Sequence, residues 1–145
     1  TEAYLLSGAL QGVHSSCDWQ GKKEVVDFFY VKGILDVVFE KVGAKVKYAP
    51  LSINCPELHP GRSAEILLNN EIIGYVGELH PTLVKAEDIE PTYVFEIKLE
   101  PLFNIPSNVV LFKQISKVPS VERDLALVMD QSIAVGEVVI DVTKT

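Results

Sequence analysis

Cysteine and histidine side chains, the usual ligands of structural zinc, occur close together at two places in the 145-residue chain. One is His14-Ser15-Ser16-Cys17 and the other is Cys55-Pro56-Glu57-Leu58-His59. Two thiolates and two imidazoles would complete a tetrahedral zinc site. The sequence has no C-x-x-C pair, however, and the two stretches fall in different predicted loops. We therefore favour the alternative of two free thiols in a reducing compartment, with no metal ligand among these residues.

Groups that could carry acid–base catalysis are also present, since Glu57, Glu78 and His80 stand beside predicted turns. Two carboxylates whose pKa values are pushed apart by their surroundings can act as acid and base in hydrolysis. The favoured alternative is that these are solvated groups, because glutamate is mostly exposed in proteins. The sequence also lacks a G-x-S-x-G elbow, an H-E-x-x-H helix and a G-x-x-x-x-G-K phosphate loop. We expect no catalytic and no cofactor-binding residue.

Arg62 is the side chain whose position most suggests a specific contact, because it follows His59-Pro60-Gly61 on a predicted glycine turn. A guanidinium there can clamp a carboxylate or a phosphate with two parallel hydrogen bonds. The favoured alternative is that Arg62 holds its own turn by donating to loop carbonyl groups. The two hypotheses differ in the acceptor that they predict.

A repeated tetrapeptide, Glu-Leu-His-Pro at residues 57–60 and again at 78–81, brackets a predicted β-hairpin. Alternating apolar side chains predict a strand over residues 64–68, and a second strand returns over residues 71–79. Asn69-Asn70 between the strands tolerates positive φ and predicts a tight reversal. Because the residue before proline avoids the α region, each His-Pro step ends an element.

Two glycines interrupt the returning strand of the hairpin three residues apart. Such glycines usually mark a bulge or a close approach of another backbone. Gly74-x-x-Gly77 is too short for a nucleotide cradle and lies on a strand, so we assign it to architecture. The residues expected to shape this structural motif are His59, Pro60, Gly61, Arg62, Gly74, Gly77, His80 and Pro81.

A helix is predicted ahead of the hairpin, because apolar residues recur at helical spacing from Val25 to Val42 and Gly43 is placed to end the helix. Gly33 costs this helix about 1 kcal/mol relative to alanine, so we expect a close neighbour or an irregular first turn there. Residues 4–10 are apolar on both faces, which predicts a central, buried strand. The polar residues 14–23 predict a surface loop.

Shorter elements complete the expected order. Residues 45–49 predict a strand, residues 81–89 a short helix, and residues 95–100 a strand with one buried and one wet face. Residues 101–119 hold three prolines and predict a linker. A strand over residues 124–130 and an amphipathic helix from Val135 follow the linker.

Composition is that of an ordinary globular protein, with 48% hydrophobic and 23% charged residues. No apolar run is long enough for a membrane span and no signal peptide is visible, so we expect a cytoplasmic location and no membrane partner. The net charge is −7, and residues 1–112 carry −6 of it, from 9 basic and 15 acidic residues. An acidic module favours a scaffold over a nucleic-acid binder. The chain starts at Thr1, so we expect it to be part of a longer protein.

Several motifs in order resemble one family. The run LHPGRSAEI, followed by IGYVGELHP, resembles the C-terminal half of phenylalanyl-tRNA synthetase beta subunits. Val26-Asp27-Phe28-Phe29 with Lys32-Gly33 is similar to the DFF-x-x-KG element that opens a helix in their catalytic-like module, and Tyr93-Val94-Phe95-Glu96 to its next strand. Ile115–Pro119 and Val121–Val128 are similar to the start of their ferredoxin-like anticodon-binding domain. The resemblance covers nearly the whole chain.

The resemblance implies an α+β fold, with a largely antiparallel sheet and flanking helices like the core of class II synthetases. Residues 1–112 would be the C-terminal portion of a non-catalytic, catalytic-like module. Residues 113–145 would be the first strand and helix of an incomplete ferredoxin-like unit, which cannot close a core alone.

The resemblance also implies a role. The beta subunit would scaffold an alpha subunit that carries the chemistry, in a heterotetramer that uses ATP and Mg²⁺ to join phenylalanine to its tRNA. This chain alone would be inactive and would hold no cofactor. The tRNA would bind through the complete C-terminal domain, where Lys117 and Arg123 are candidate contacts to the tRNA backbone. The alternative is that both residues are solvated at the start of a strand, where Asp124 partly neutralises Arg123; it explains them equally well. The alternative function is a small His/Cys metal-binding or enzyme domain.

Overall fold

The computed structural model describes residues 2–17, 21–52, 55–106, 112, 117–119, 121–130, 133 and 135–143. The chain divides into two compact units, Thr1–Val110 and Leu111–Thr145. The elements in chain order are β1 (Leu5–Gln11), β2 (Val13–Cys17), β3 (Lys22–Val25), α1 (Phe28–Val42), β4 (Val46–Ala49), β5 (Leu58–Leu68), β6 (Glu71–Leu79), α2 (Pro81–Ala86), β7 (Thr92–Lys98), α3 (Glu100–Phe103) and α4 (Val135–Thr143). The predicted α+β class with a mostly antiparallel sheet is confirmed.

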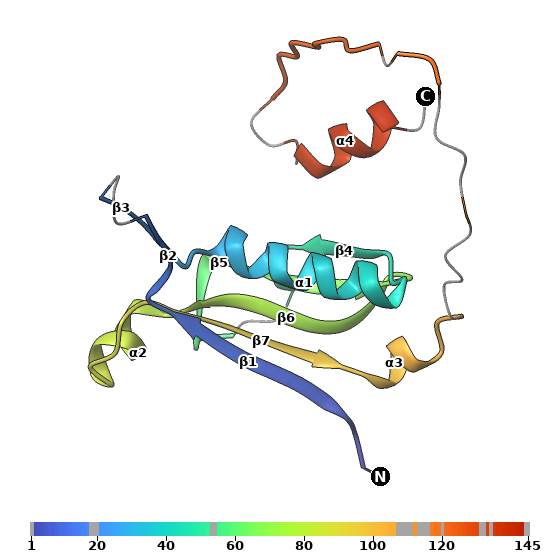
Figure 1. The fold of residues 1–145 in the computed structure, drawn as a ribbon. Coiled ribbons are helices and arrows are strands. Elements are labelled where there is room, and N and C mark those ends of the chain that lie inside the picture. Colours follow the sequence, from blue (N-terminus) through green and yellow to red (C-terminus); the bar gives the residue numbers. More distant parts are fainter. Residues whose placement is uncertain are drawn as a thin grey trace. The chain divides into compact units, whose positions relative to one another are not determined.

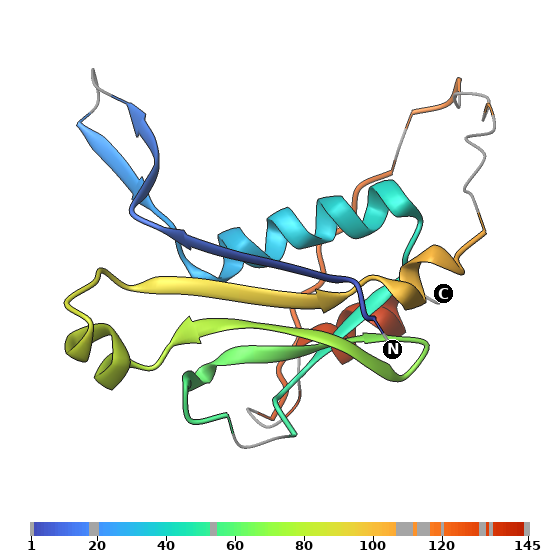
Figure 2. The ribbon, with the colours of Figure 1, turned by 90° about the horizontal axis from the view of Figure 1, so that it is seen from below.

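Five strands form one antiparallel sheet in the order β1-β7-β6-β5-β4, and β2 pairs with β3 in a separate hairpin (Figures 1 and 2). The predicted hairpin is confirmed as β5 and β6. Asn69 and Asn70 have φ angles of 53° and 68°, which suits a two-residue turn whose twist matches that of the strands. The hairpin therefore supplies two of the three inner strands of the sheet.

A bulge and a close approach of another backbone, the two features that the glycines predicted, are both present at Gly74. The register of β5 and β6 shifts by one residue between Ile66 and Leu67, which leaves the buried Ile73 as the extra residue. On the other side of β6, a Cβ at position 74 would overlap the carbonyl oxygen of Glu96 in β7. A residue with a side chain cannot occupy this place without moving β7.

Helix α1 covers one face of the sheet (Figure 1). The Asp27 side chain caps its first turn by accepting a hydrogen bond from Tyr30 N at 2.7 Å, and Gly43 ends it in the left-handed conformation, φ 74°. Val31, Leu35 and Phe39, spaced four residues apart, are buried against the sheet. The prediction of the helix is confirmed except for its start, because Val25 ends β3.

The N-terminal strand is the clearest error of the sequence analysis. β1 is an edge strand that pairs only with β7 among the described strands, and Leu5 and Leu6 are exposed. The prediction of a buried central strand rested on apolar side chains on both faces, a pattern that does not specify how many neighbours the strand has. Leu10 does pack against the core.

Three further segments differ from expectation. Residues 13–25 contain the β2–β3 hairpin instead of a continuous loop, and the expected linker begins with the helical turn α3. Residues 121–130 of the second unit form no strand, because no other described segment there offers strand pairing. The predicted C-terminal helix is confirmed as α4. No helix within the described residues is long and apolar enough to cross a membrane.

Candidate functional site

The two Glu-Leu-His-Pro copies lie side by side, where β5 begins and β6 ends. Leu58 pairs with Leu79, and the backbone N–H of His80 donates to the carbonyl oxygen of Glu57 at 2.7 Å. The next pair in register is Ser63 with Gly77, so the four residues 59–62 stand opposite one residue of β6. The His-Pro-Gly-Arg segment is thus an excursion just after the start of β5. The first His-Pro step therefore does not end an element as predicted, whereas the second separates β6 from α2.

Local hydrogen bonds fold this excursion into a turn. The backbone N–H of Gly61 donates to Nδ1 of His59 at 3.0 Å, and the Ser63 hydroxyl donates to the carbonyl oxygen of His59 at 2.8 Å. Gly77 lies against the returning chain, since a Cβ there would come within 2.8 Å of the Cβ of Ser63. The first histidine of the repeat therefore shapes the turn.

Arg62 bridges the excursion to the residue opposite it. Its Nη1 lies 2.8 Å from Oε2 of Glu78, whose side chain is only 8% exposed, whereas that of Arg62 is 58% exposed. Burial raises the pKa of the Tyr93 hydroxyl, and the charge of Glu78 and a hydrogen bond to it raise that pKa further. The acceptor for Arg62 is thus a carboxylate of its own chain, and not the loop carbonyls that we favoured.

A hollow of about 410 Å³ lies beside this pair. Its walls come from three segments far apart in the sequence: the start of α1, the glycine turn and β7. The lining residues are Asp27, Phe28, Phe29, Gly61, Arg62 and Tyr93. Phe28 and Phe29 stand edge to face with ring centroids 5.7 Å apart, and Phe29 is 75% exposed. The Asp-Phe-Phe and Pro-Gly-Arg motifs therefore meet at one surface.

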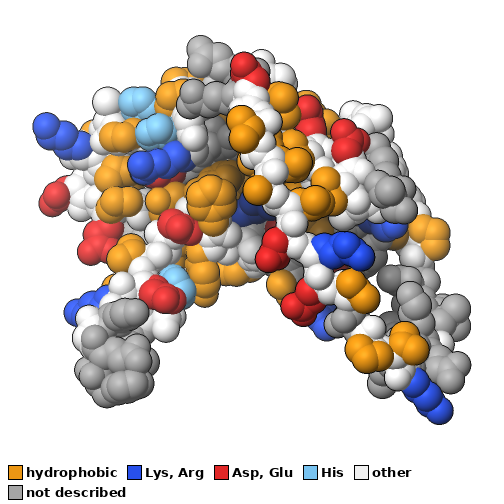
Figure 3. All heavy atoms as spheres, turned by 90° about the horizontal axis from the view of Figure 1, so that it is seen from above, with side chains coloured by type: hydrophobic (Ala, Val, Ile, Leu, Met, Phe, Trp, Pro, Cys, Tyr) orange, Lys and Arg blue, Asp and Glu red, His pale blue; other side chains and the backbone are white. Residues whose placement is uncertain are grey.

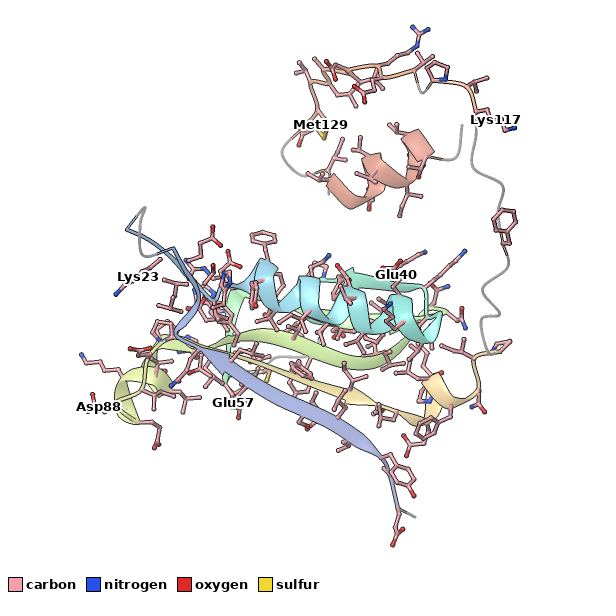
Figure 4. The ribbon with its side chains drawn as sticks, viewed as in Figure 1. Lys23, Glu40, Glu57, Asp88, Lys117 and Met129 are labelled. Atoms are coloured by element: carbon pink, nitrogen blue, oxygen red, sulfur yellow. The ribbon has the colours of Figure 1, made fainter. Side chains whose placement is uncertain are left out.

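The proposed acid–base residues have separate partners. Glu57, labelled in Figure 4, is exposed, and its Oε2 accepts a hydrogen bond from Cys55 Sγ at 3.3 Å. Glu78 is bound to Arg62, and Nδ1 of His80 accepts a hydrogen bond from Thr82 N at 3.3 Å at the start of α2. This arrangement suits strand and helix ends and brings no catalytic set together.

The proposed zinc ligands are also engaged elsewhere. The ring of His14 stacks on that of Tyr30, with centroids 3.8 Å apart, and Cys55 contacts Glu57. The side chain of Cys17 lies outside the described residues. Among the side chains that the structure describes, no three of His, Cys, Asp and Glu are placed to hold a metal ion.

A second hollow, of about 680 Å³, lies beside the paired tetrapeptides, and Arg62 is not among its lining residues. Its walls are mostly apolar, and include three prolines. Cys55 and His80 are the most reactive side chains that line this hollow. Cys55 already contacts Glu57, and His80 already contacts Thr82. We therefore regard the Arg62 surface as the better candidate.

The hydrogen bond of Tyr93 to Glu78 and its place in the wall of the hollow were not predicted from the sequence. The alternation of the strand could have indicated this position. Tyr93 lies four residues before Ile97, so both side chains point to the same buried face of β7. Lys117 and Arg123 lie in the second unit, where both are exposed.

Residues 1–99 match the family described as phenylalanyl tRNA synthetase beta chain CLM domain. The phenylalanine–tRNA ligase beta subunit of Staphylococcus aureus is 43% identical over 132 residues, which is 91% of this chain and 16% of that protein. The beta subunit of Geobacillus kaustophilus is 44% identical over 133 residues, 90% of this chain and 16% of that protein. The chain thus spans about a sixth of these relatives, and it belongs to the phenylalanyl-tRNA synthetase beta chain family.

Proposed function

We propose that the chain is a scaffold module of a phenylalanine–tRNA ligase beta subunit. It would support an alpha subunit that charges tRNA with phenylalanine in a cytoplasmic heterotetramer, and it would be inactive alone. The observation that carries this proposal is the arrangement around Arg62, where the motif side chains bind one another. A buried Glu78 held by Arg62 fixes the shape of the hairpin, and this carboxylate is not free to act as an acid or base on a substrate.

The proposed architecture follows the family. Residues 1–112 would be the C-terminal portion of a class II-like module, and residues 113–145 the start of a ferredoxin-like anticodon-binding domain. The antiparallel sheet and the helix α1 on one of its faces support the first assignment. Helix α4, placed after a stretch that has no strand partner in the described chain, supports the second, because such a piece needs further elements to bury its apolar face.

ATP and Mg²⁺, which the whole enzyme would use, do not fit the residues described here. Magnesium needs clustered oxygen ligands, and no group of three acidic or histidine side chains is placed for a metal in the described parts of the chain. Gly74 and Gly77 cannot cradle phosphates, since each lies against a neighbouring strand. We therefore assign both groups to the alpha subunit.

Contact with tRNA would come from the second unit, with Lys117 and Arg123 on the phosphate backbone. Both side chains are exposed, as such a contact requires. On the face seen in Figure 3, Lys and Arg side chains are scattered among acidic and hydrophobic ones. With a net charge of −6 on residues 1–112, the first unit is a poor binder of phosphate and suits a protein partner.

Co-expression with the alpha subunit of the same organism tests the proposal. We expect the two chains to co-purify, and the chain alone to form no phenylalanyl-tRNA. Charging activity by the chain alone would contradict the scaffold role. Stoichiometric zinc that is lost, together with stability, in Cys17→Ser or Cys55→Ser would instead establish the metal-binding alternative.

A further inference from the structure

The turn that His59 holds fixes the protonation state of its ring. Nδ1 of His59 lies 3.0 Å from the backbone nitrogen of Gly61, a group that can only donate a hydrogen bond. Nδ1 must therefore accept, so the ring is neutral and carries its proton on Nε2. An imidazolium has a proton on both nitrogens and cannot accept this bond. Protonation of His59 thus removes a contact that shapes the turn.

Side chains supply the contacts of this turn, because the described register between β5 and β6 skips it. The His59–Gly61 bond lies at its start, and the Ser63 hydroxyl donates to the carbonyl oxygen of His59 at 2.8 Å. Arg62, the last residue of the turn, reaches Glu78 at 2.8 Å. A segment held in this way can open locally while the rest of the sheet stays folded.

The charged and titratable groups on this turn and on the segments around it have partners other than the His59 ring. They are Asp27, Cys55, Glu57, Arg62, Glu78, His80 and Tyr93. None of the ion pairs among the described side chains includes His59. A second proton on its ring therefore gains no salt bridge there that would offset the lost hydrogen bond.

The other two histidines lack this sensitivity. Nδ1 of His80 accepts from Thr82 N at 3.3 Å, and it lies 2.7 Å from the Thr82 hydroxyl oxygen. A hydroxyl can donate or accept, so a protonated Nδ1 can keep that second contact by donating to Oγ1. Nε2 of His14 lies 3.9 Å from Oε2 of Glu24, close enough for an ion pair when the ring is charged. His59 is therefore the histidine whose described contacts acid should break.

We propose that the His-Pro-Gly-Arg turn is a pH-sensitive switch, closed while His59 is neutral and opened when its ring takes up a second proton. Histidine is the side chain whose ordinary charge change falls between about pH 5 and pH 8, so the turn responds near neutral pH. Opening frees the Gly61 N–H and loosens the segment that carries Arg62 to Glu78. The neutral ring stabilises the folded chain, so this contribution is present at higher pH and is lost on acidification.

The test compares urea unfolding of the 145-residue chain at about pH 8 and about pH 6. The reference variant is His59→Asn, because an asparagine side chain accepts the same backbone N–H in an Asx turn and does not titrate. We expect the wild-type midpoint to fall on acidification by about 0.5 M more than that of His59→Asn, as loss of one hydrogen bond predicts. The matched control, His14→Asn, should lose at least as much on acidification as the wild type.

The amide resonance of Gly61 in the wild-type chain reports the same event and does not depend on the folding of any variant. On acidification we expect its proton signal to move to higher field, because the N–H loses its acceptor. A Gly61 signal that does not move between the two pH values would overturn the proposal. So would an equal fall of the urea midpoint in the wild type and in His59→Asn.

Discussion

Three glycine-to-alanine substitutions should change stability in opposite directions, in an order set by what the new methyl group meets. At Gly74 the Cβ would overlap the carbonyl oxygen of Glu96 and lie 2.9 Å from the Cα of Ile97, both of them backbone atoms of an inner strand. At Gly77 it would lie 2.8 Å from the Cβ of Ser63. At Gly33 it would meet nothing within 4 Å.

The expected magnitudes follow from these contacts. Gly74→Ala must push β7 away from β6 at the place where Ile97 is 1% exposed, so we expect a loss of about 4 kcal/mol or more, which is exceptional for one substitution. Gly77→Ala meets a side-chain carbon first and should cost about 1–3 kcal/mol, as overpacking does. Gly33→Ala should gain about 1 kcal/mol through helix propensity.

Urea unfolding of the chain, followed by circular dichroism, measures these differences as shifts of the midpoint at constant slope. Because domains of this size are stable by about 5–15 kcal/mol, a loss of about 4 kcal/mol removes roughly a quarter to four fifths of the stability, so Gly74→Ala should unfold at a much lower urea concentration. A Gly74→Ala midpoint within experimental error of the wild type would refute the tight β6–β7 packing. A lower midpoint for Gly33→Ala would mean that position 33 is not open.

Three other substitutions test the site and the helix. Arg62→Met leaves the buried carboxylate of Glu78 without its guanidinium and should lower the urea midpoint more than Lys85→Met; equal effects would show that the ion pair contributes nothing. Asp27→Ala removes the α1 cap and should cost about 1 kcal/mol of unfolding free energy, whereas Asp27→Asn keeps a capping oxygen and should retain most of that stability. Burial, a hydrogen bond to Glu57 and its charge raise the pKa of Cys55, so at pH 8 less thiolate is present and alkylation should be slower than for a free cysteine. In a Cys17→Ser background, Glu57→Gln should lower that pKa and speed the reaction; an unchanged pH–rate profile would rule out the contact.

The hairpin could be predicted from sequence because its signals are local. Alternation fixes which face of β5 is buried, and Asn69-Asn70 fixes the turn and hence the register near it. The cap of α1 at Gly43 is likewise a property of neighbouring residues. Gly74 was assigned to a bulge or a close contact, and the structure has both.

The errors concern facts that depend on distant segments. Apolar side chains on both faces of β1 do not reveal that it pairs with only one described strand. The acceptor of Arg62 could not be predicted, because it depends on four residues of β5 standing opposite Glu78 alone. The strand expected at residues 124–130 failed because alternation describes a side-chain pattern, whereas a strand also needs a neighbour for its backbone groups.

The polar side chains of the repeated motif are held by contacts within their own chain. His59 binds its own turn, His80 begins α2, and Arg62 neutralises Glu78. A side chain held in such a contact must break it before it can bind a substrate, and for a buried carboxylate that loss is large. Apolar side chains of this unit also remain exposed, among them Phe29 and Val37 on α1 and Leu5 and Leu6 on β1. A partner of this module should therefore depend more on exposed apolar side chains such as Phe29 and Val37 than on its histidines.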